Sequence, residues 1–143
     1  MDGGILSEKQ TRKYGEVVMT KKIYLMWNSY VSNELLTICA VTRVKNLYLL
    51  KYDKEALIAQ TQGCILPFPY SEQVVCFPKL PPFFESRKLN PDIRRRMGIV
   101  CDNDDFSILL SNHGQKNSDN FLIISDKSYR MLKNPEEDKT LKR

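Results

Sequence analysis

Residues 22–52, KIYLMWNSYVSNELLTICAVTRVKNLYLLKY, decide the fold. This stretch holds three segments rich in Ile, Leu, Val and Tyr, which are residues that favour strands. The turn-forming groups NSYVSN and TRVKN separate them, so we expect strands over 23–28, 34–41 and 45–52. Connections this short join antiparallel neighbours, and the stretch therefore predicts an antiparallel meander. Beyond it, DKEALIAQTQ predicts one or two helical turns and CILPFP a short strand.

The pattern then becomes helical. PPFFESRKL begins with prolines, which a helix tolerates in its first turn, and NPDIRRRMG has Asn90 as its cap and Gly98 as its terminator. Ile93 and Met97 lie four residues apart, so we expect both to face the core. DNDDFSILLSNHG predicts another helix of the same kind, with an acidic start and Gly114 as its terminator. NFLIIS predicts a last strand.

Length and composition indicate one globular domain. A chain of 143 residues with 42% hydrophobic and 27% charged residues is typical of a soluble protein with a modest core. It has neither an apolar run of membrane-spanning length nor a signal-peptide core, and we expect it to be cytoplasmic. Changes in composition predict a disordered N-terminal tail over 1–21, a domain over 22–125 and a polar C-terminal tail over 126–143.

The net charge of +5 raises the question of nucleic acid binding. The basic surplus lies in the two ends of the chain, whereas the segment between them is nearly neutral. Arg94, Arg95 and Arg96 are consecutive, so a helix spreads them around its circumference and they do not all face one phosphate path. We therefore expect no specific DNA binding by this chain alone.

Catalytic and metal-binding patterns are missing from the sequence. The glycines are dispersed, so no phosphate-binding loop is present, and His113 is the sole histidine. The four cysteines are scattered without a CxxC pair, which argues against zinc. Asp102, Asp104 and Asp105 suit the start of a helix better than a metal site. We expect no enzyme activity, no metal and no cofactor.

The segment PFPYSEQVVCFPKLPP, residues 67–82, predicts a long loop bounded by prolines. Its tip is apolar, although a loop tip that faces only water is normally polar. One interpretation is contact with a partner protein, and the other is that Val75 and Phe77 pack back over the sheet. We favour contact for Phe77, and we expect Phe83 and Phe84 to lie in the core.

FPKLPPFFESRKLNPDIRRRMGIVCDNDDFSILLSNHG (77–114), followed by FLII (121–124), resembles the N-terminal subdomain of the HipA family of toxin kinases. IYLMWNSYVSNELL and YLLKYDKEAL are similar to the opening hairpin and to a strand of that subdomain. The resemblance covers about 22–125 and ends where a kinase body would begin, as in stand-alone, HipS-like relatives. LNPD in place of the usual Leu-Pro-Glu-Gly, and Asp119 where the family has a glycine, are departures that affect loop geometry.

This resemblance implies an α+β fold, a small curved antiparallel β-sheet or barrel capped by short α-helices. It also implies an antitoxin that binds a HipT-like Ser/Thr kinase toxin through the 70–80 loop, in a larger complex with a helix-turn-helix, HipB-like DNA-binding protein. The alternative is an assembly subunit that bridges the two without inhibiting the kinase. The expected kinase contacts are Val74, Val75, Cys76, Phe77, Pro78 and Lys79. Arg94, Arg95 and Arg96 form a possible secondary contact.

Overall fold

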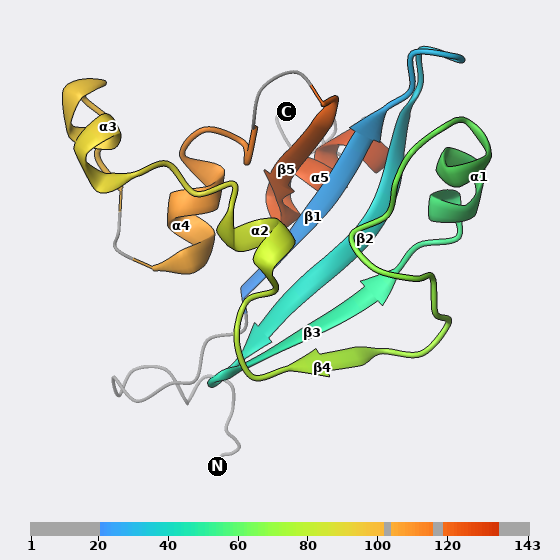
Figure 1. Ribbon diagram of the computed structural model, residues 1–143, viewed down its shortest axis with the longest axis horizontal. Helices are drawn as coiled ribbons and strands as arrows, with labels where there is room; N and C mark the ends of the chain where they lie inside the picture. The colour runs from blue at the N-terminus through green and yellow to red at the C-terminus, as the bar shows by residue number, and fades with distance from the viewer. Residues whose placement is uncertain (1–20, 102–103, 116–118, 135–143) are drawn as a thin grey trace.

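The computed structural model of the chain describes residues 21–101, 104–115 and 119–134. It has an α+β fold, with one five-stranded antiparallel sheet and short helices (Figure 1). Apart from residue 21, the N-terminal tail predicted over 1–21 lies outside the described residues. The strands are β1 (Lys21–Asn28), β2 (Leu35–Val44), β3 (Leu47–Tyr52), β4 (Val75–Phe77) and β5 (Phe121–Ser125).

The strands lie in the order β4-β3-β2-β1-β5, which confirms the predicted meander of the first three and the predicted last strand. The strand predicted from CILPFP is wrong, because residues 64–69 form none. A register shift between Leu25 and Met26 interrupts the β1–β2 ladder, and such a bulge bends and twists a strand. β4 and β5 are the two edges of the described sheet, which is therefore open and does not close into the barrel that the resemblance implies.

The core lies on one face of this sheet. Ile23, Leu25 and Trp27 alternate along β1 and point to that face, as the period of two in a strand requires. The helices α2 (Pro82–Glu85) and α4 (Asp105–Leu110) cover it (Figure 1). Buried side chains from both helices join the same apolar cluster, as do two alanines of α1 (Glu55–Thr61). The helical residues of the cluster are Ala56, Ala59, Phe84, Phe106 and Leu109.

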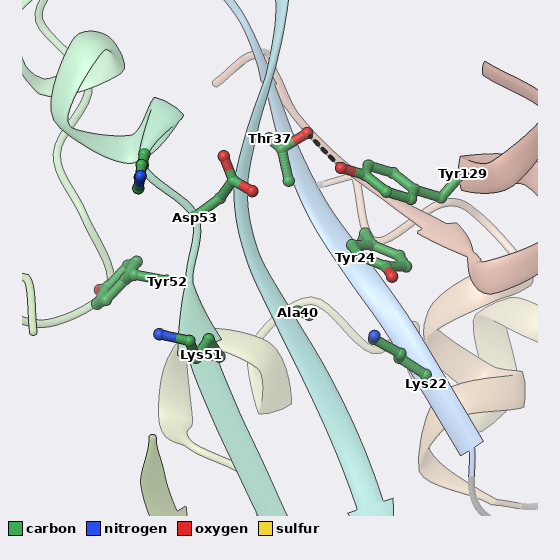
Figure 2. A pocket seen from close by; sticks show the side chains of 9 residues that line it. Lys22, Tyr24, Thr37, Ala40, Lys51, Tyr52, Asp53 and Tyr129 are labelled. Carbon is green, nitrogen blue, oxygen red and sulfur yellow. Dashed lines mark hydrogen bonds between the residues drawn. The ribbon is translucent and has the colours of Figure 1, made fainter. Parts of the chain in front are cut away.

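The opposite face of the sheet carries α5 (Asp126–Lys133), a helix within the segment that composition marks as a polar tail. Ser125 caps it by accepting a hydrogen bond from the backbone N–H of Ser128 at 3.1 Å. The Tyr129 ring stacks on Tyr24 of β1, with 3.7 Å between ring centroids (Figure 2). The Thr37 hydroxyl of β2 donates to the Tyr129 hydroxyl oxygen at 3.2 Å. This helix therefore belongs to the folded domain.

The turn after α4 requires glycine at Gly114. Its φ is +63°, a conformation that L side chains rarely adopt, and an added Cβ would lie 2.3 Å from Cδ1 of Ile123. Ile123 is fully buried in β5, and its backbone N–H donates to the His113 carbonyl at 2.7 Å. The glycine lets α4 end directly against β5. The glycine predicted to terminate this helix lies in the turn that follows it, since α4 itself ends at Leu110 with Ser111 as its C-cap.

Arg87 joins α2 to the turn before β5 and is almost fully buried. Its guanidinium donates to the Gly114 carbonyl at 3.0 Å and forms an ion pair with Asp119. The same group lies over the rings of Phe83 and Phe121, at 4.3 and 5.0 Å from their centroids. A planar cation suits this position because it combines directed hydrogen bonds with stacking. Asp119, one of the departures from the family pattern, is therefore the partner of a buried arginine.

Candidate functional site

The predicted contact residues 74–79 form an edge strand and its flanks. β4 pairs antiparallel with β3, with Val75 opposite Leu50 and Phe77 opposite Tyr48. No other strand of the described chain pairs with its outer side (Figure 1). The prediction that 67–82 lacks secondary structure is wrong here. A three-residue strand gives only a weak signal in the sequence. Residues 75–77 form a strand because they pair with β3.

The side chains of this edge segment divide between two directions. Val75 and Phe77 are half-buried, and Phe77 packs against the core with its ring edge-on to Phe68 at 5.5 Å. The remaining side chains of the segment are exposed to solvent, and Val74 has an exposed fraction of 53%. These outward residues are Val74, Cys76, Pro78 and Lys79. The six predicted contact residues thus include two that anchor the strand and four that a partner can reach.

The chain leading into β4 is fixed by polar contacts. The Tyr52 hydroxyl donates to the Phe68 carbonyl at 2.5 Å and accepts from the Phe68 N–H at 3.1 Å. The Lys51 ammonium donates to the Glu72 carbonyl at 2.9 Å. Burial raises the pKa of the Tyr52 hydroxyl and outweighs the opposite effect of its bond to the Phe68 carbonyl, so this group stays protonated at neutral pH. The segment reaches the sheet edge in a defined path, which lowers the entropy lost when a partner binds it.

A hollow of about 290 Å³ lies at the C-terminal end of this segment. Pro78 and Lys79 form one wall, and Arg43 and Tyr48 contribute from β2 and β3. Two carboxylates face the same space, so the hollow combines cationic and anionic groups. The complete lining is Arg43, Asn46, Tyr48, Pro78, Lys79, Leu80, Glu85 and Asp105.

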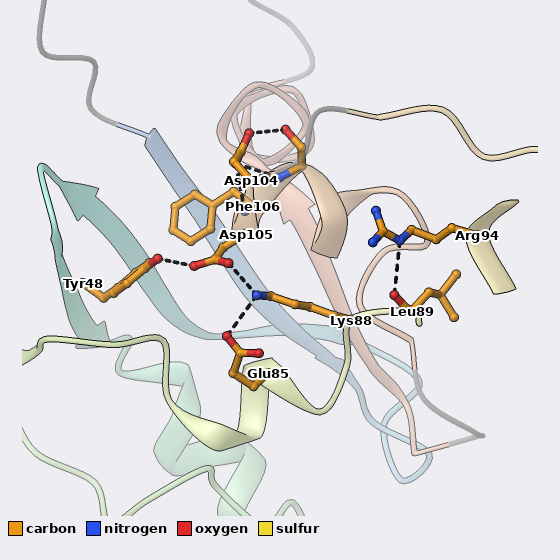
Figure 3. A network of polar contacts seen from close by, with 9 residues as sticks. Tyr48, Glu85, Lys88, Leu89, Arg94, Asp104, Asp105 and Phe106 are labelled. Carbon is orange, nitrogen blue, oxygen red and sulfur yellow. Dashed lines mark hydrogen bonds and ion pairs between the residues drawn. The ribbon is translucent and has the colours of Figure 1, made fainter. Parts of the chain in front are cut away.

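An ion-pair network forms the acidic side of this hollow (Figure 3). The Asp105 carboxylate accepts hydrogen bonds from the Tyr48 hydroxyl and the Lys88 ammonium, and Lys88 also reaches Glu85 at 2.9 Å. Partial burial alone would raise the pKa of Asp105, but the bonds from Lys88 and Tyr48 outweigh it and lower that pKa. Burial, followed by the bond to Asp105, raises the pKa of Tyr48 to about 12. Asp105 and Lys88 therefore stay charged at neutral pH while the Tyr48 hydroxyl stays protonated, and the network joins β3, α2 and α4.

Sequence reasoning did not find this hollow. Glu85 and Asp105 come from two helices that are distant in sequence, and for Asp105 the sequence indicates only a place at the start of a helix. Asp104 is the residue that caps α4, since it accepts from the backbone N–H groups of Phe106 and Ser107 at 3.1 and 3.2 Å. The available signal is the spacing of Glu85 and Lys88, three residues apart, which favours an ion pair on a helical turn.

Arg94, Arg95 and Arg96 lie on α3 (Pro91–Arg96), well away from β4 (Figure 1). Asn90 caps this helix as predicted, accepting from the Asp92 N–H at 2.7 Å. The prediction that Ile93 and Met97 face the core is wrong, because α3 has no buried residue. The structure does not bring the two predicted contact sets together.

A second hollow, of about 450 Å³, lies on the outer face of the sheet between α1 and α5 (Figure 2). Its lining includes three lysines and the stacked tyrosines Tyr24 and Tyr129. The ammonium of Lys22 lies over the Tyr24 ring, 5.1 Å from its centroid. Lys51, another of the three, is held by the Glu72 carbonyl. The lysines are exposed and the hollow is open, as on an ordinary solvated surface.

The four cysteines are free thiols that lie either in the core or at the surface. Cys39 and Cys64 are buried, and burial raises the pKa of both thiols, that of Cys64 to about 11. Cys76 is exposed on β4 and Cys101 is half-buried beside Arg94. Within the described ranges, no group of three or more His, Cys, Asp or Glu side chains is placed to hold a metal ion. Asp102, of the acidic group seen in the sequence, lies outside the described residues.

Two further findings bear on function. No helix in the described part of the chain is both long and apolar enough to cross a membrane. Comparisons with protein-family models, with curated proteins and with solved structures gave no match.

Proposed function

We propose that this chain is a HipS-like antitoxin that binds and neutralises a HipT-like Ser/Thr kinase toxin, with the β4 edge segment as the inhibitory contact. The observation that supports this most is the position of residues 74–79. They form an edge of the sheet, are held in place by Phe77 and Val75, and present Val74, Cys76, Pro78 and Lys79 outward. An exposed edge that combines free backbone groups with apolar side chains is a surface suited to another protein.

The segment acts by occupying kinase surface, without chemistry of its own. Lys79 and Arg43 beside Pro78 can pair with carboxylates of the kinase, while Glu85 offers a partly exposed carboxylate to a cation. The sheet corresponds to the curved sheet or barrel of the HipA N-terminal subdomain in this proposal. The complex is cytoplasmic and includes a HipB-like helix-turn-helix protein that supplies specific DNA binding.

Co-expression with a HipT-like kinase encoded beside this chain tests the proposal. Wild-type chain should restore growth and co-purify with the kinase. Val74→Asp and Lys79→Glu should weaken rescue, because both side chains are exposed and outward. Val31→Asp, at a side chain 67% exposed elsewhere on the surface, is the matched control and should rescue fully. Absence of any co-purification by the wild-type chain would refute the antitoxin function.

The alternative is an assembly subunit that bridges the kinase to the DNA-binding protein without blocking catalysis. The basic helix α3, which lies apart from β4, is the feature that favours it, because it offers a second surface. Phosphorylation by purified kinase separates the two functions. An antitoxin lowers the rate when this chain is added at saturation, whereas a bridging subunit binds and leaves the rate unchanged.

A further inference from the structure

Residues 89–101, here called the α3 knob, project from the domain beside α4 (Figure 1). Local bonds close the knob at its base. The Arg94 guanidinium donates to the Leu89 carbonyl at 3.2 Å (Figure 3) and lies 3.8 Å from the Cys101 sulfur. Gly98, with a φ of +74°, ends the helix, and the Ile99 N–H donates to the Arg94 carbonyl at 3.0 Å. The knob thus has a defined shape although its helix contributes nothing to the core.

The knob exposes apolar side chains. Ile93 is 38% accessible, Met97 is 62% accessible and Val100 is 96% accessible. Ile93 and the C-cap residue Met97 are four residues apart and so share one side of the helical turn, whereas Val100 follows Gly98 and lies beyond the helix. An apolar pair four residues apart on a short helix can anchor it in a groove of another protein, and Val100 adds apolar surface beside this pair. Rigid anchors in water lose little entropy on docking, which makes a preformed knob an efficient contact.

Charge identifies the kind of groove. Arg95 and Arg96 are exposed at the end of the helix, next to the exposed Met97. Asp92 pairs with Arg95, whereas no carboxylate of the described chain forms an ion pair with Arg96. The helix dipole places its negative end at the same point, yet the three arginines leave the knob positive. Carboxylates on the rim of the groove would complement this surface.

We propose that the α3 knob inserts into an apolar groove with an acidic rim on the kinase, at a place separate from the contact made by β4. This inference rests on the proposed function, since it takes the kinase as the partner. A lipid surface fits less well, because a knob with a six-residue helix and three exposed apolar side chains buries too little area for stable anchoring. A DNA backbone would engage the arginines and leave the apolar side chains in water.

Two separate contacts on one kinase have a consequence for inhibition. Once the α3 knob is docked, β4 meets the kinase within one complex, at an effective concentration set by the rigid domain between them. The knob then governs how long the complex lasts, whereas β4 governs whether the kinase is active. Loss of the knob should therefore weaken binding without changing the residual kinase activity at saturation.

The test uses the full chain, a catalytically inactive form of the HipT-like kinase, and calorimetric titration at two salt concentrations. Met97→Asp combined with Val100→Asp should raise Kd by about tenfold or more, as expected for the loss of docking anchors. Ile65→Asp, at a side chain that is 84% exposed elsewhere, should leave Kd within about twofold. Circular dichroism checks that each variant is folded, and the exposure of all three sites predicts that it is.

Arg96→Glu examines the acidic rim. This variant should raise Kd by about tenfold at low salt and by less at about 0.5 M salt, where charge interactions are screened. A double aspartate variant that binds as tightly as the wild type overturns the knob as an anchor while the proposed function stands. Wild-type chain that fails to bind the kinase overturns both. Concentration-dependent dimers in sedimentation that the double variant abolishes would reassign the knob to a contact between two copies of this chain.

Discussion

The β4 segment and the α3 knob are both exposed, but the domain holds them in different ways. Phe77 of β4 packs on Phe68 and pairs with Tyr48, so the segment is part of the sheet and of the core. The knob is closed by its own Arg94 contacts and has no buried helical residue. A perturbation of β4 should therefore reach the stability of the fold, whereas a perturbation of the knob should remain local. The two regions offer a way to separate binding from folding.

Phe84 sets the upper limit of this comparison, because its α2 helix follows β4 directly and its side chain is fully buried. Phe84→Ala should lower the free energy of unfolding by about 3–5 kcal/mol, the usual cost of removing a buried phenylalanine. Urea denaturation followed by circular dichroism measures it. The half-buried Phe83 is the control, and alanine there should cost less. Equal losses of stability at the two positions would show that Phe83 contributes to the core as much as Phe84 does.

Arg87 should give the next largest effect. Arg87→Met keeps apolar contact with Phe83 and Phe121 but removes the bonds to Gly114 and Asp119. Because hydrogen bonds to a charged group contribute strongly, unfolding should become easier by about 2–3 kcal/mol. The change is measured as a shift of the urea midpoint.

Arg95→Met is the matched control for this change, since the Arg95–Asp92 pair is 71% exposed on both sides. Its effect should stay below about 1 kcal/mol, as for other surface ion pairs. A larger loss at Arg95 than at Arg87 would contradict the view that the knob is energetically separate.

Phe77 tests the claim that β4 belongs to the sheet. Phe77→Ala should cost about 1–2 kcal/mol, less than a fully buried phenylalanine because the ring is half-buried. Cys76→Ser, on the outward side of the same strand, should cost under about 0.5 kcal/mol. Thermal melts of both variants decide the point. A Phe77→Ala protein as stable as the wild type would return the segment to the free loop that its sequence predicts.

Asp105 provides a pH test of the network that joins β3 to the helices. Its pKa is lowered in the folded state, so its contribution is present above the unfolded pKa of about 3.9 and is lost as the pH falls through the folded value. Wild type should therefore exceed Asp105→Asn in stability by about 1 kcal/mol at neutral pH. The difference should shrink below about pH 4. Denaturation midpoints of both proteins, measured in steps of about one pH unit from about pH 2 to about pH 7, test this prediction. A difference that stays constant over this range would exclude the charged network.

The sequence predicts the elements that depend on local rules. The strands of the meander follow from strand-forming residues and turns, and Asn90 and Gly98 mark the ends of α3 through capping and a positive φ. Local rules do not predict β4, because its three residues form a strand only by pairing with β3, which is distant in the sequence. The eight-residue α5 helix was missed for another reason, since it lies in a segment of polar composition.

The candidate site shows the same limit. The apolar pattern of 74–79 indicates an unusual surface segment, but only the fold shows that Phe77 points inward and Cys76 outward. The hollow beside it depends on Glu85 and Asp105, which the packing of α2 and α4 brings together. In α3 the spacing of Ile93 and Met97 predicts a side that faces the core, and this prediction is wrong because both side chains are exposed.

Met97 should give the smallest effect of all, and this is the sharpest test of the difference between the regions. Met97→Ser removes an apolar side chain that is 62% exposed, so the folded state loses little burial and the free energy of unfolding should change by less than about 0.5 kcal/mol. Leu109→Ser, in the fully buried part of α4, is the matched change in the core and should unfold much of the protein. Urea denaturation of the two variants in parallel makes the comparison. A loss of about 2 kcal/mol or more at Met97 would show that this side chain is buried within the domain, and the knob would then be part of the scaffold.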